Sequence, residues 1–340
     1  MNNILDYSRK DLEKYFTDIG EKKYIASQLF DWIYKKNTYD FSKMTNLSNN
    51  LRDDLSRDFT INLPITKKIL KSKGTIKCLF ELSDGNLIES VVMEHGYGIS
   101  ACISTQIGCN MGCSFCQSGK TKKIRNLQVS ELVTQIMFIE SNLGKKISSV
   151  VLMGIGEPFD NYENVMKFVH IINDKNGLNI GARRITISTA GIPKFIKKYA
   201  LEDIKANLAI SLHAPNDTLR SKLMNINKAF NLKEVMSAIK FYLEKTHRRV
   251  CIQYIMLDNI NDSKKCAIEL AELLSGLNVY VNLIAYNRTS DSVFKPSSEK
   301  NIECFMNILK SKGIDTCVRV KFGSDINASC GQLKANFESK

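Results

Sequence analysis

The sequence has little that interrupts regular structure, and it has no long apolar run. Of its 340 residues only 5 are proline, 1 is tryptophan and 4 are histidine. No uninterrupted apolar run is longer than a handful of residues, and Val150 to Met153 is typical. This excludes a membrane-spanning helix of about 20 apolar residues. The first ten residues lack the apolar segment of a secretory signal. We therefore expect a soluble protein of the cytoplasm.

Acidic residues are too few to balance the basic ones. There are 35 Asp and Glu against 48 Lys and Arg, which gives a formal net charge of +13. Such an excess attracts polyanions, of which nucleic acid is the usual one. A solvated, lysine-rich surface is the other interpretation, and charge alone does not decide between them. The hydrophobic content of 44% is ordinary for a globular chain, and the length allows one to three domains.

Cysteine, in contrast, is abundant. Ten cysteines without an export signal favour thiol chemistry or metal binding over structural disulfides. Three of them, Cys109, Cys113 and Cys116, lie close together in the sequence. Five scattered cysteines fall in apolar strand or helix patterns and are expected to be small core residues: Cys78, Cys251, Cys266, Cys304 and Cys317.

Residues 1–94 form the first of three predicted regions, an accessory domain. The first 60 residues show the periodicity of amphipathic helices. A basic stretch from Pro64 to Lys77 follows, and two alternating segments then predict a hairpin around an Asp84-Gly85 turn. The predicted hairpin strands are residues 75–83 and 86–94, and a short connector at 94–100 ends the domain.

From Ser100 onward, apolar strands alternate with amphipathic helices. This alternation predicts parallel strands joined by helical crossovers. Six strands are predicted, at residues 101–106, 148–153, 184–188, 206–212, 250–256 and 279–285. Six units are too few to close an eight-stranded barrel, so we expect an α/β fold with an open, partial (β/α)6 barrel over residues 95–324 and a tail at 325–340. In such barrels the chemistry lies at the carboxyl ends of the strands.

The three clustered cysteines follow the first predicted strand of this barrel. In the spacing Cys109-x3-Cys113-x2-Cys116, three thiolates can bind three irons of a [4Fe–4S] cluster and leave the fourth iron open to another ligand. A zinc site is the alternative, but structural zinc normally has four ligands, and the nearest further cysteine, Cys102, lies on the strand. The motif therefore favours an iron–sulfur cluster.

This motif, placed after the first strand of a partial barrel, resembles the radical S-adenosylmethionine (SAM) superfamily. Gly154-Ile155-Gly156-Glu157-Pro158 is similar to the loop that binds the amino group of the cofactor's methionine. Three further segments, at residues 102–109, 211–217 and 328–333, together resemble the RlmN/Cfr family of RNA adenine methyltransferases. The similarity extends over nearly the whole chain. It implies an RNA-binding accessory domain, a radical SAM core and a tail that carries a methyl-accepting cysteine.

The resemblance also implies a role for each matching residue. The cluster ligands would be Cys109, Cys113 and Cys116. The cofactor site would be formed by Gly156, Glu157, Ser188, Ser211, Leu212, His213 and Asn287. Cys330 would carry the methyl group, Cys102 would resolve it through a transient disulfide, and Glu89 would be the proton acceptor.

The reaction of this family gives both cysteines outside the cluster a purpose. Adenine C2 has no electron pair with which to attack a sulfonium methyl group. The resemblance implies a polar methyl transfer to Cys330, and then removal of a hydrogen from that methyl group by a 5′-deoxyadenosyl radical, so that two SAM molecules are used per turnover. The methyl carbon then joins C2, and attack by Cys102 on the Cys330 sulfur releases the product.

The implied substrates are an adenosine at the peptidyl-transferase centre of 23S rRNA and an adenosine in the anticodon loop of tRNA. The reaction would need an external electron donor such as flavodoxin or ferredoxin and a thiol reductant, and the protein would be a monomer. An adenine is accessible only where it is unstacked. We expect phosphate contacts from the basic stretch and from residues just after the cysteine loop, namely Lys120, Lys122, Lys123 and Arg125.

Two other functions remain open at the level of sequence. Pro158 matches the RlmN branch, which methylates C2, whereas Cfr proteins have alanine there. The alternative within the family is a Cfr-like C8 methyltransferase that confers resistance to ribosomal antibiotics, and the alternative of another class is a non-enzymatic, metal-bearing RNA-binding protein. Asn327 and Ser329 replace the usual Asp and Ala of the family, and Lys321-Phe322 alters the preceding basic stretch, but every residue that carries chemistry is present.

Overall fold

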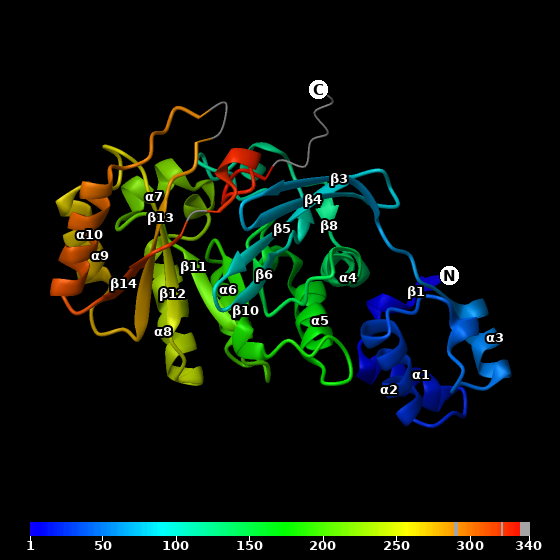
Figure 1. Ribbon diagram of the computed structural model, residues 1–340. Helices are drawn as coiled ribbons and strands as arrows, with labels where there is room; N and C mark the ends of the chain where they lie inside the picture. Colours follow the sequence, from blue (N-terminus) through cyan, green and yellow to red (C-terminus); the bar gives the residue numbers. More distant parts are fainter. Residues whose placement is uncertain (289–291, 321, 334–340) are drawn as a thin grey trace.

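The computed structural model describes residues 1–288, 292–320 and 322–333, and at its centre is a ten-stranded mixed sheet (Figure 1). The predicted α/β partial barrel is confirmed, because six strands run parallel in the order β6-β9-β10-β11-β12-β13. Their bounds are β6 Gly98–Cys102, β9 Ser149–Leu152, β10 Ile185–Thr189, β11 Asn207–Ser211, β12 Val250–Met256 and β13 Val279–Ala285. Every residue of β12 is buried, as a central strand of a parallel sheet requires.

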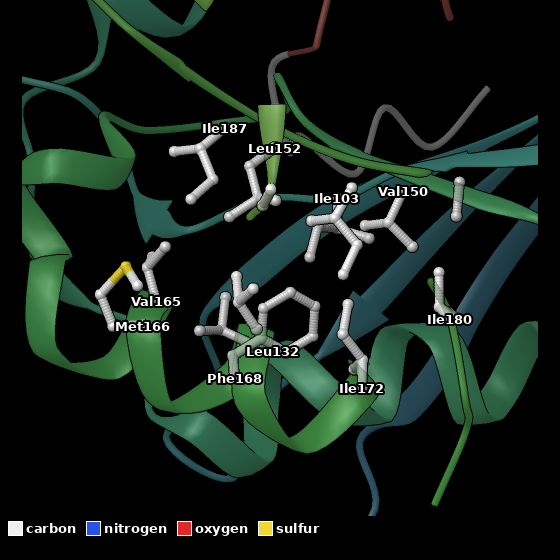
Figure 2. Packing of buried hydrophobic residues seen from close by; sticks show 14 of the residues in the cluster. Ile103, Leu132, Val150, Leu152, Val165, Met166, Phe168, Ile172, Ile180 and Ile187 are labelled. Atoms are coloured by element: carbon white, nitrogen blue, oxygen red, sulfur yellow. The ribbon is translucent and has the colours of Figure 1, made fainter. Parts of the chain in front are cut away.

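Helices alternate with these strands and cover the sheet. They are α4 Val129–Leu143, α5 Tyr162–Asn173, α6 Pro193–Tyr199, α7 Asp217–Leu223, α8 Leu232–Thr246, α9 Lys264–Leu274 and α10 Glu299–Ser311. Figure 2 shows Leu132 of α4 and Phe168 of α5 packed beside Val150 and Leu152 of β9, and all four side chains are buried. The main hydrophobic core therefore lies between the sheet and its helices.

Local capping explains where the longer helices begin and end. Before α4, Gln128 and Glu131 form a reciprocal capping box, and Gly144 ends the helix in a left-handed conformation. Before α8, Asn231 and Glu234 form a second capping box. These contacts satisfy N–H groups that have no partner inside the helix.

Two strands differ from the sequence prediction. The first barrel strand ends at Cys102 rather than at residue 106, because the Ser104 N–H donates to Gln135 Oε1 at 2.9 Å and the Ser104 hydroxyl donates to the Glu89 carbonyl at 2.6 Å. A seventh parallel strand, β14 (Asp315–Val318), pairs with β13 although the sequence does not predict it. Three of its four residues are exposed, so it lacks the apolar pattern of the other strands.

The predicted N-terminal helices are present as α1 Arg9–Asp18, α2 Tyr24–Phe30 and α3 Asn49–Asp58. They form the blue group beside α5 in Figure 1. Two short strands, β1 (Asn2–Asn3) and β2 (Phe59–Thr60), pair in parallel and join the ends of this helical unit. The guanidinium of Arg9 lies 2.8 Å from the carboxylate of Asp174, which follows α5, and so ties the unit to the barrel.

The predicted hairpin is also present, as β4 (Thr75–Glu81) and β5 (Leu87–His95). The basic stretch before it forms a further antiparallel strand, β3 (Ile65–Ser72). Strand β5 pairs with β6, so that the hairpin extends the barrel sheet. The predicted boundary between the accessory domain and the barrel, at residue 95, thus falls at the turn between β5 and β6, which belong to one continuous sheet.

The C-terminal segment, defined here as residues 322–333, leaves β14 and crosses back over the sheet toward β5. Figure 1 shows it in red near β3 and β5. Ala328 and Leu333 pack there against Val91, Met93 and Cys102 in a small apolar patch. Lys321 and residues 334–340 of the expected tail lie outside the described residues. Within the described part of the chain, no helix is long and apolar enough to cross a membrane.

Candidate active site

Loops at the carboxyl ends of the parallel strands surround one pocket. The cysteine loop after β6 contributes Cys109, Cys113 and Cys116. The carboxyl ends of β9, β10 and β11 and the loops that follow them contribute Gly154, Gly156, Glu157, Ser188, Thr189, Ser211 and His213. The C-terminal segment closes another side with Cys330 and Leu333. The structure therefore brings the expected cluster ligands, most of the expected cofactor residues and Cys330 to one place.

Two expected cofactor residues lie just behind this lining. Leu212 is fully buried, and its carbonyl accepts a hydrogen bond from Arg220 Nε at 3.3 Å. Asn287 follows β13 and donates through Nδ2 to the Cys330 carbonyl at 3.5 Å. These two residues support the walls of the pocket rather than form them.

The cysteine loop is wrapped tightly because two glycines permit it. Gly108 has a φ of +73°, and a Cβ there would lie 2.3 Å from the Lys122 carbonyl oxygen. Gly112 has a φ of +62° and faces Asn225 in the same way. The Cys109 N–H donates to the Thr121 carbonyl at 2.9 Å, which holds the two ends of the loop together. A side chain at position 108 would require the backbone to shift, and one at position 112 would displace the Asn225 side chain and strain the left-handed backbone.

The three thiols of this loop lie in apolar surroundings. Met111 and Phe115 pack around them. Burial raises the pKa of Cys109 to about 12, and burial together with neighbouring thiolates raises the pKa of Cys113. Thiolates in such a place need a soft cation for charge balance, and iron–sulfur clusters provide one.

The number of thiols also bears on the kind of metal centre. The three thiols come from one short loop and line one pocket. Structural zinc normally has four ligands, whereas three cysteines can bind three irons of a [4Fe–4S] cluster. This donor set fits a cluster.

Glu157 is fixed by main-chain donors beside the thiols. Its carboxylate accepts hydrogen bonds from the Ala190 N–H at 2.7 Å and the Phe159 N–H at 2.9 Å. Burial raises the pKa of this carboxyl to about 7. A cation placed in the pocket would favour the ionised form, and the ammonium group of an amino acid is such a cation.

The backbone on either side of Glu157 approaches its neighbours closely. Gly156 has a φ of +108°, and a Cβ there would lie 2.6 Å from the Gln106 Cβ. The Gln106 side chain accepts from the Glu157 N–H at 2.8 Å and donates to Asp160 at 2.9 Å. The sequence gives no indication of this role for Gln106, because a single glutamine at the end of a predicted strand has no distinctive pattern.

His213 is a neutral side chain in this pocket. Its Nδ1 accepts from the Ile255 N–H at 3.0 Å, so the proton of the neutral ring is on Nε2. Burial, together with the nearby charge of Arg220, lowers its pKa to about 3. The ring stands edge-on against Phe115 of the cysteine loop, with centroids 4.9 Å apart.

Arg220 of α7 joins two of the loops that line the pocket. The side chain is fully buried and donates to the carbonyls of Ala190 at 2.6 Å and Leu212 at 3.3 Å, and to Asn227 at 2.8 Å. Burial lowers its pKa to about 10. An arginine on a short helix usually indicates a solvated face, so its pattern in the sequence did not reveal this role.

Cys330 lines the pocket together with the cysteine loop, and the carbonyl of the next residue, Gly331, accepts a hydrogen bond from the Gln117 N–H at 2.8 Å. On either side of Cys330, Ala328 and Leu333 pack in the same apolar patch as Cys102. Burial raises the pKa of Cys102 and Cys116, and the effect of Cys330 on both agrees with this placement. Cys102 is buried, with a pKa raised to about 12, whereas Cys330 is exposed. Both are free thiols in this structure.

Glu89 lies on β5, outside the pocket lining. It is buried, and its carboxylate forms an ion pair of 2.6 Å with Lys77. Two residues further along the strand, Val91 pairs with Cys102. Glu89 and Cys102 therefore belong to the same face of the sheet, which the C-terminal segment covers.

The four candidates for RNA contact divide into two kinds. Lys120 and Lys122 are exposed. Lys123 pairs with Asp160 at 2.7 Å, and Arg125 pairs with both Glu131 and Asp84 at 2.7 Å. The last two side chains brace the cysteine loop against the barrel, and a phosphate would have to compete with these carboxylates.

Comparison with known proteins places this geometry in a family. Residues 2–61 match the model described as the ribosomal RNA large subunit methyltransferase N-terminal domain, and residues 103–274 match the radical SAM superfamily. A protein of Acholeplasma laidlawii named "Probable dual-specificity RNA methyltransferase RlmN" is 49% identical over 333 residues, which are 98% of this chain and 98% of that protein. The chain belongs to the RlmN family of radical SAM RNA methyltransferases.

Other members of the RlmN family agree in length and fold. A Spiroplasma citri protein with the same printed name is 48% identical over 342 residues and covers 99% of both chains. The crystal structure of a radical SAM methyltransferase from Sphaerobacter thermophilus superposes with a TM-score of 0.92 at 39% identity, over 99% of this chain and 100% of that one. As a radical SAM enzyme the chain uses a [4Fe–4S] cluster and SAM.

Proposed function

We propose that this chain methylates C2 of an unstacked adenosine in 23S rRNA and in tRNA through a methyl group carried on Cys330. The observation that carries the proposal is the place of Cys330, at the pocket and near both Cys102 and the cysteine loop. An arrangement in which one thiol reaches both a methyl donor and a second thiol suits a carrier of methyl groups. The names of the relatives, which describe a dual-specificity RNA methyltransferase, support the choice of substrate.

Different residues of the pocket would bind the cluster and SAM. Cys109, Cys113 and Cys116 would hold the cluster. Glu157 would accept the ammonium group of SAM, and the rest of the cofactor would contact Gly156, Ser188, Ser211 and His213. Leu212 and Asn287 would support this site from behind the lining. When bound and reduced by an external donor such as flavodoxin or ferredoxin, the cluster supplies a 5′-deoxyadenosyl radical from SAM.

The chain's own side chains carry the methyl group and the proton. Cys330 accepts a methyl group as a thiolate, and after a hydrogen atom is removed from it, the carbon bonds to adenine C2. Glu89 takes the proton from C2. The unpaired electron that the addition leaves on the ring passes to the external electron carrier. The Cys102 thiolate then attacks the Cys330 sulfur, and the bond between that sulfur and the carbon breaks with its electron pair on the carbon, which takes up a proton to become the methyl group of the product. A disulfide remains that a thiol reductant reopens. Two SAM molecules are consumed in each cycle.

The proposal favours C2 over C8 because Pro158 follows Glu157. This proline occupies the first turn of the short helix 158–161, where its missing N–H costs nothing. The Glu157 side chain caps the same helix through the Phe159 N–H. The residue that distinguishes the two branches thus lies directly beside the carboxylate assigned to SAM.

Mass spectrometry of nucleosides tests the proposal. We expect 2-methyladenosine in 23S rRNA and tRNA from cells that express the chain, and none in cells that lack it. Cys330→Ala should abolish the product, whereas Cys304→Ala on α10 should leave it at the wild-type level. A product methylated at C8, or unmodified RNA, would contradict the proposal, as would purified anaerobic protein that holds zinc instead of iron and sulfide.

A further inference from the structure

A buried lysine joins Glu89 to the segment that carries Cys330. Lys77 Nζ lies 2.6 Å from Glu89 Oε1, and it donates a hydrogen bond of 3.1 Å to the carbonyl oxygen of Asn327. The two charged side chains are only 10% and 4% exposed. Lys77 is the last residue of the basic stretch that the sequence analysis assigned to phosphate contact, yet its ammonium group points into the protein.

The register of the sheet explains why these groups meet. In the antiparallel ladder, Lys77 on β4 lies opposite Val91 on β5, and Val91 lies opposite Cys102 on β6. Residues directly opposite each other share a face, and Glu89 is two residues from Val91 and so points to that face as well. Lys77, Glu89 and Cys102 therefore lie on one surface, across which the C-terminal segment is laid.

The contact with the C-terminal segment is made to its main chain. Asn327 adopts a left-handed conformation with a φ of +51°, and its carbonyl oxygen accepts from Lys77 three residues before Cys330. The departure of this chain from the family's usual Asp at position 327 changes only the side chain. It therefore leaves the hydrogen bond to Lys77 intact.

We propose that Lys77 is a positioning residue, which holds the Glu89 carboxylate in a fixed place relative to the segment that carries Cys330. This role rests on the function proposed above. When the methylene carbon has joined C2, the C2–H bond breaks, the proton passes to a carboxylate oxygen of Glu89, and the electron pair of that bond stays with the ring. The unpaired electron left by the addition passes to the external electron carrier named above. Because Lys77 contacts both the Glu89 carboxylate and the Asn327 carbonyl, it would align the proton acceptor and the segment that carries Cys330 on the same adenine.

The experiment uses the full chain with its cluster reconstituted, SAM, and an RNA hairpin with an unpaired adenosine. In Lys77→Met we expect methylation of Cys330 and formation of 5′-deoxyadenosine within twofold of wild type. Release of methylated RNA should fall at least tenfold, and a covalent adduct between Cys330 and RNA should accumulate. Lys77→Arg should release methylated RNA at least three times faster than Lys77→Met, because it restores the cation.

A matched control is a lysine that pairs with another carboxylate of β5, the strand of Glu89. Lys145 pairs with Glu94 of β5 at 2.5 Å, on the surface of the sheet, and Lys145→Met should behave as wild type in every assay. If Lys77→Met instead loses Cys330 methylation in the same proportion as product, the lysine only anchors the C-terminal segment, and the proposal is overturned.

A double variant controls for misfolding of Lys77→Met, which removes the lysine from its ion pair with a buried carboxylate. Lys77→Met/Glu89→Gln removes both charges. Its rate of adduct resolution should equal that of Glu89→Gln within twofold, because Lys77 acts through Glu89, and a further tenfold decrease would refute the proposal. A wild-type chain that gives neither adduct nor methylated adenosine would refute the proposed function, and the role of Lys77 with it.

Discussion

At the scale of single residues, main-chain groups set the positions of the side chains in the pocket. Glu157 is held by two backbone N–H groups, and His213 by a third. Next to Glu157, Gly156 lets the backbone pass close to Gln106, whose side chain accepts from the Glu157 N–H. A change of one atom at such a glycine is therefore expected to act on both folding and cofactor binding.

Gly156→Ala tests the close approach. The new Cβ would lie 2.6 Å from the Gln106 side chain at a φ of +108°, so we expect the free energy of unfolding to fall by about 3 kcal/mol. Gly276→Ala is the control, because Gly276 also has a positive φ but nothing within 4 Å, and it should cost about 1 kcal/mol. Urea unfolding of both variants measures the difference, and equal losses would show that contact with Gln106 is unimportant.

Glu157 gives a pH dependence whose sign is fixed. Its pKa is about 7 in the folded chain against an ordinary 4.5, so between these values the folded chain keeps a proton that the unfolded chain has lost. In the cluster-free chain, the contribution of Glu157 to the free energy of unfolding is fully present below pH 4.5. This contribution, about 3 kcal/mol, should be lost as the pH rises through 7. Glu157→Gln should lack this part of the slope in urea unfolding curves from pH 4.5 to 8, and parallel curves would contradict the assignment.

At the scale of elements, helix α7 connects loops that are distant in sequence. Arg220 reaches from α7 to the loops after β10 and β11 through the carbonyls of Ala190 and Leu212. Because Ala190 also donates to Glu157, the helix helps to fix the carboxylate assigned to SAM. A short helix thus contributes more to the pocket than its length suggests.

Arg220→Ala removes this connection. Several buried acceptors would lose their donor, so the free energy of unfolding should fall by at least about 3 kcal/mol. Lys222→Ala on the exposed side of the same helix should change it by less than about 0.5 kcal/mol. Equilibrium SAM binding should weaken in the first variant only. If the Arg220 variant binds SAM as wild type does, the loops are held by other contacts.

Elements with a strong apolar pattern could be predicted from the sequence, and those without one could not. Strands β12 and β13 have the predicted bounds because their residues are almost all buried. Strand β14 is mostly exposed, and β3 was interpreted only as a basic stretch. For the site, the spacing of the cysteine loop gave the metal chemistry, whereas Lys77 and Arg220 gave no indication, because burial of a charge depends on partners from distant parts of the chain.

At the scale of the whole molecule, positive charge is divided between structure and surface. Lys77, Lys123 and Arg125 are in ion pairs with carboxylates of the fold, so the net charge of +13 overstates what is available to RNA. The exposed Lys122, next to the cysteine loop, is better placed to meet phosphate. Affinity for RNA should therefore depend on a few lysines of this kind.

The salt dependence of RNA binding checks this division. Raising the salt from 50 to 200 mM should weaken binding by roughly ten- to a hundredfold, the effect of a few released counterions. Lys122→Ala should reduce the slope of log Kd against log salt by about one. Arg125→Ala should leave the slope unchanged and lower stability, since Arg125 is bound to Glu131 and Asp84. The opposite pattern would assign the phosphate contact to Arg125.

The position of Cys330 in the sequence has a consequence for a shortened molecule. Cys330 lines the pocket but follows β14 in the sequence, after the strands and loops that form the other walls. If Cys330 carries the methyl group as proposed above, a polypeptide clipped between β14 and Cys330 would keep the sites for the cofactors but would have no thiol on which to place a methyl group. Such a molecule would not begin a reaction that joins it to its RNA.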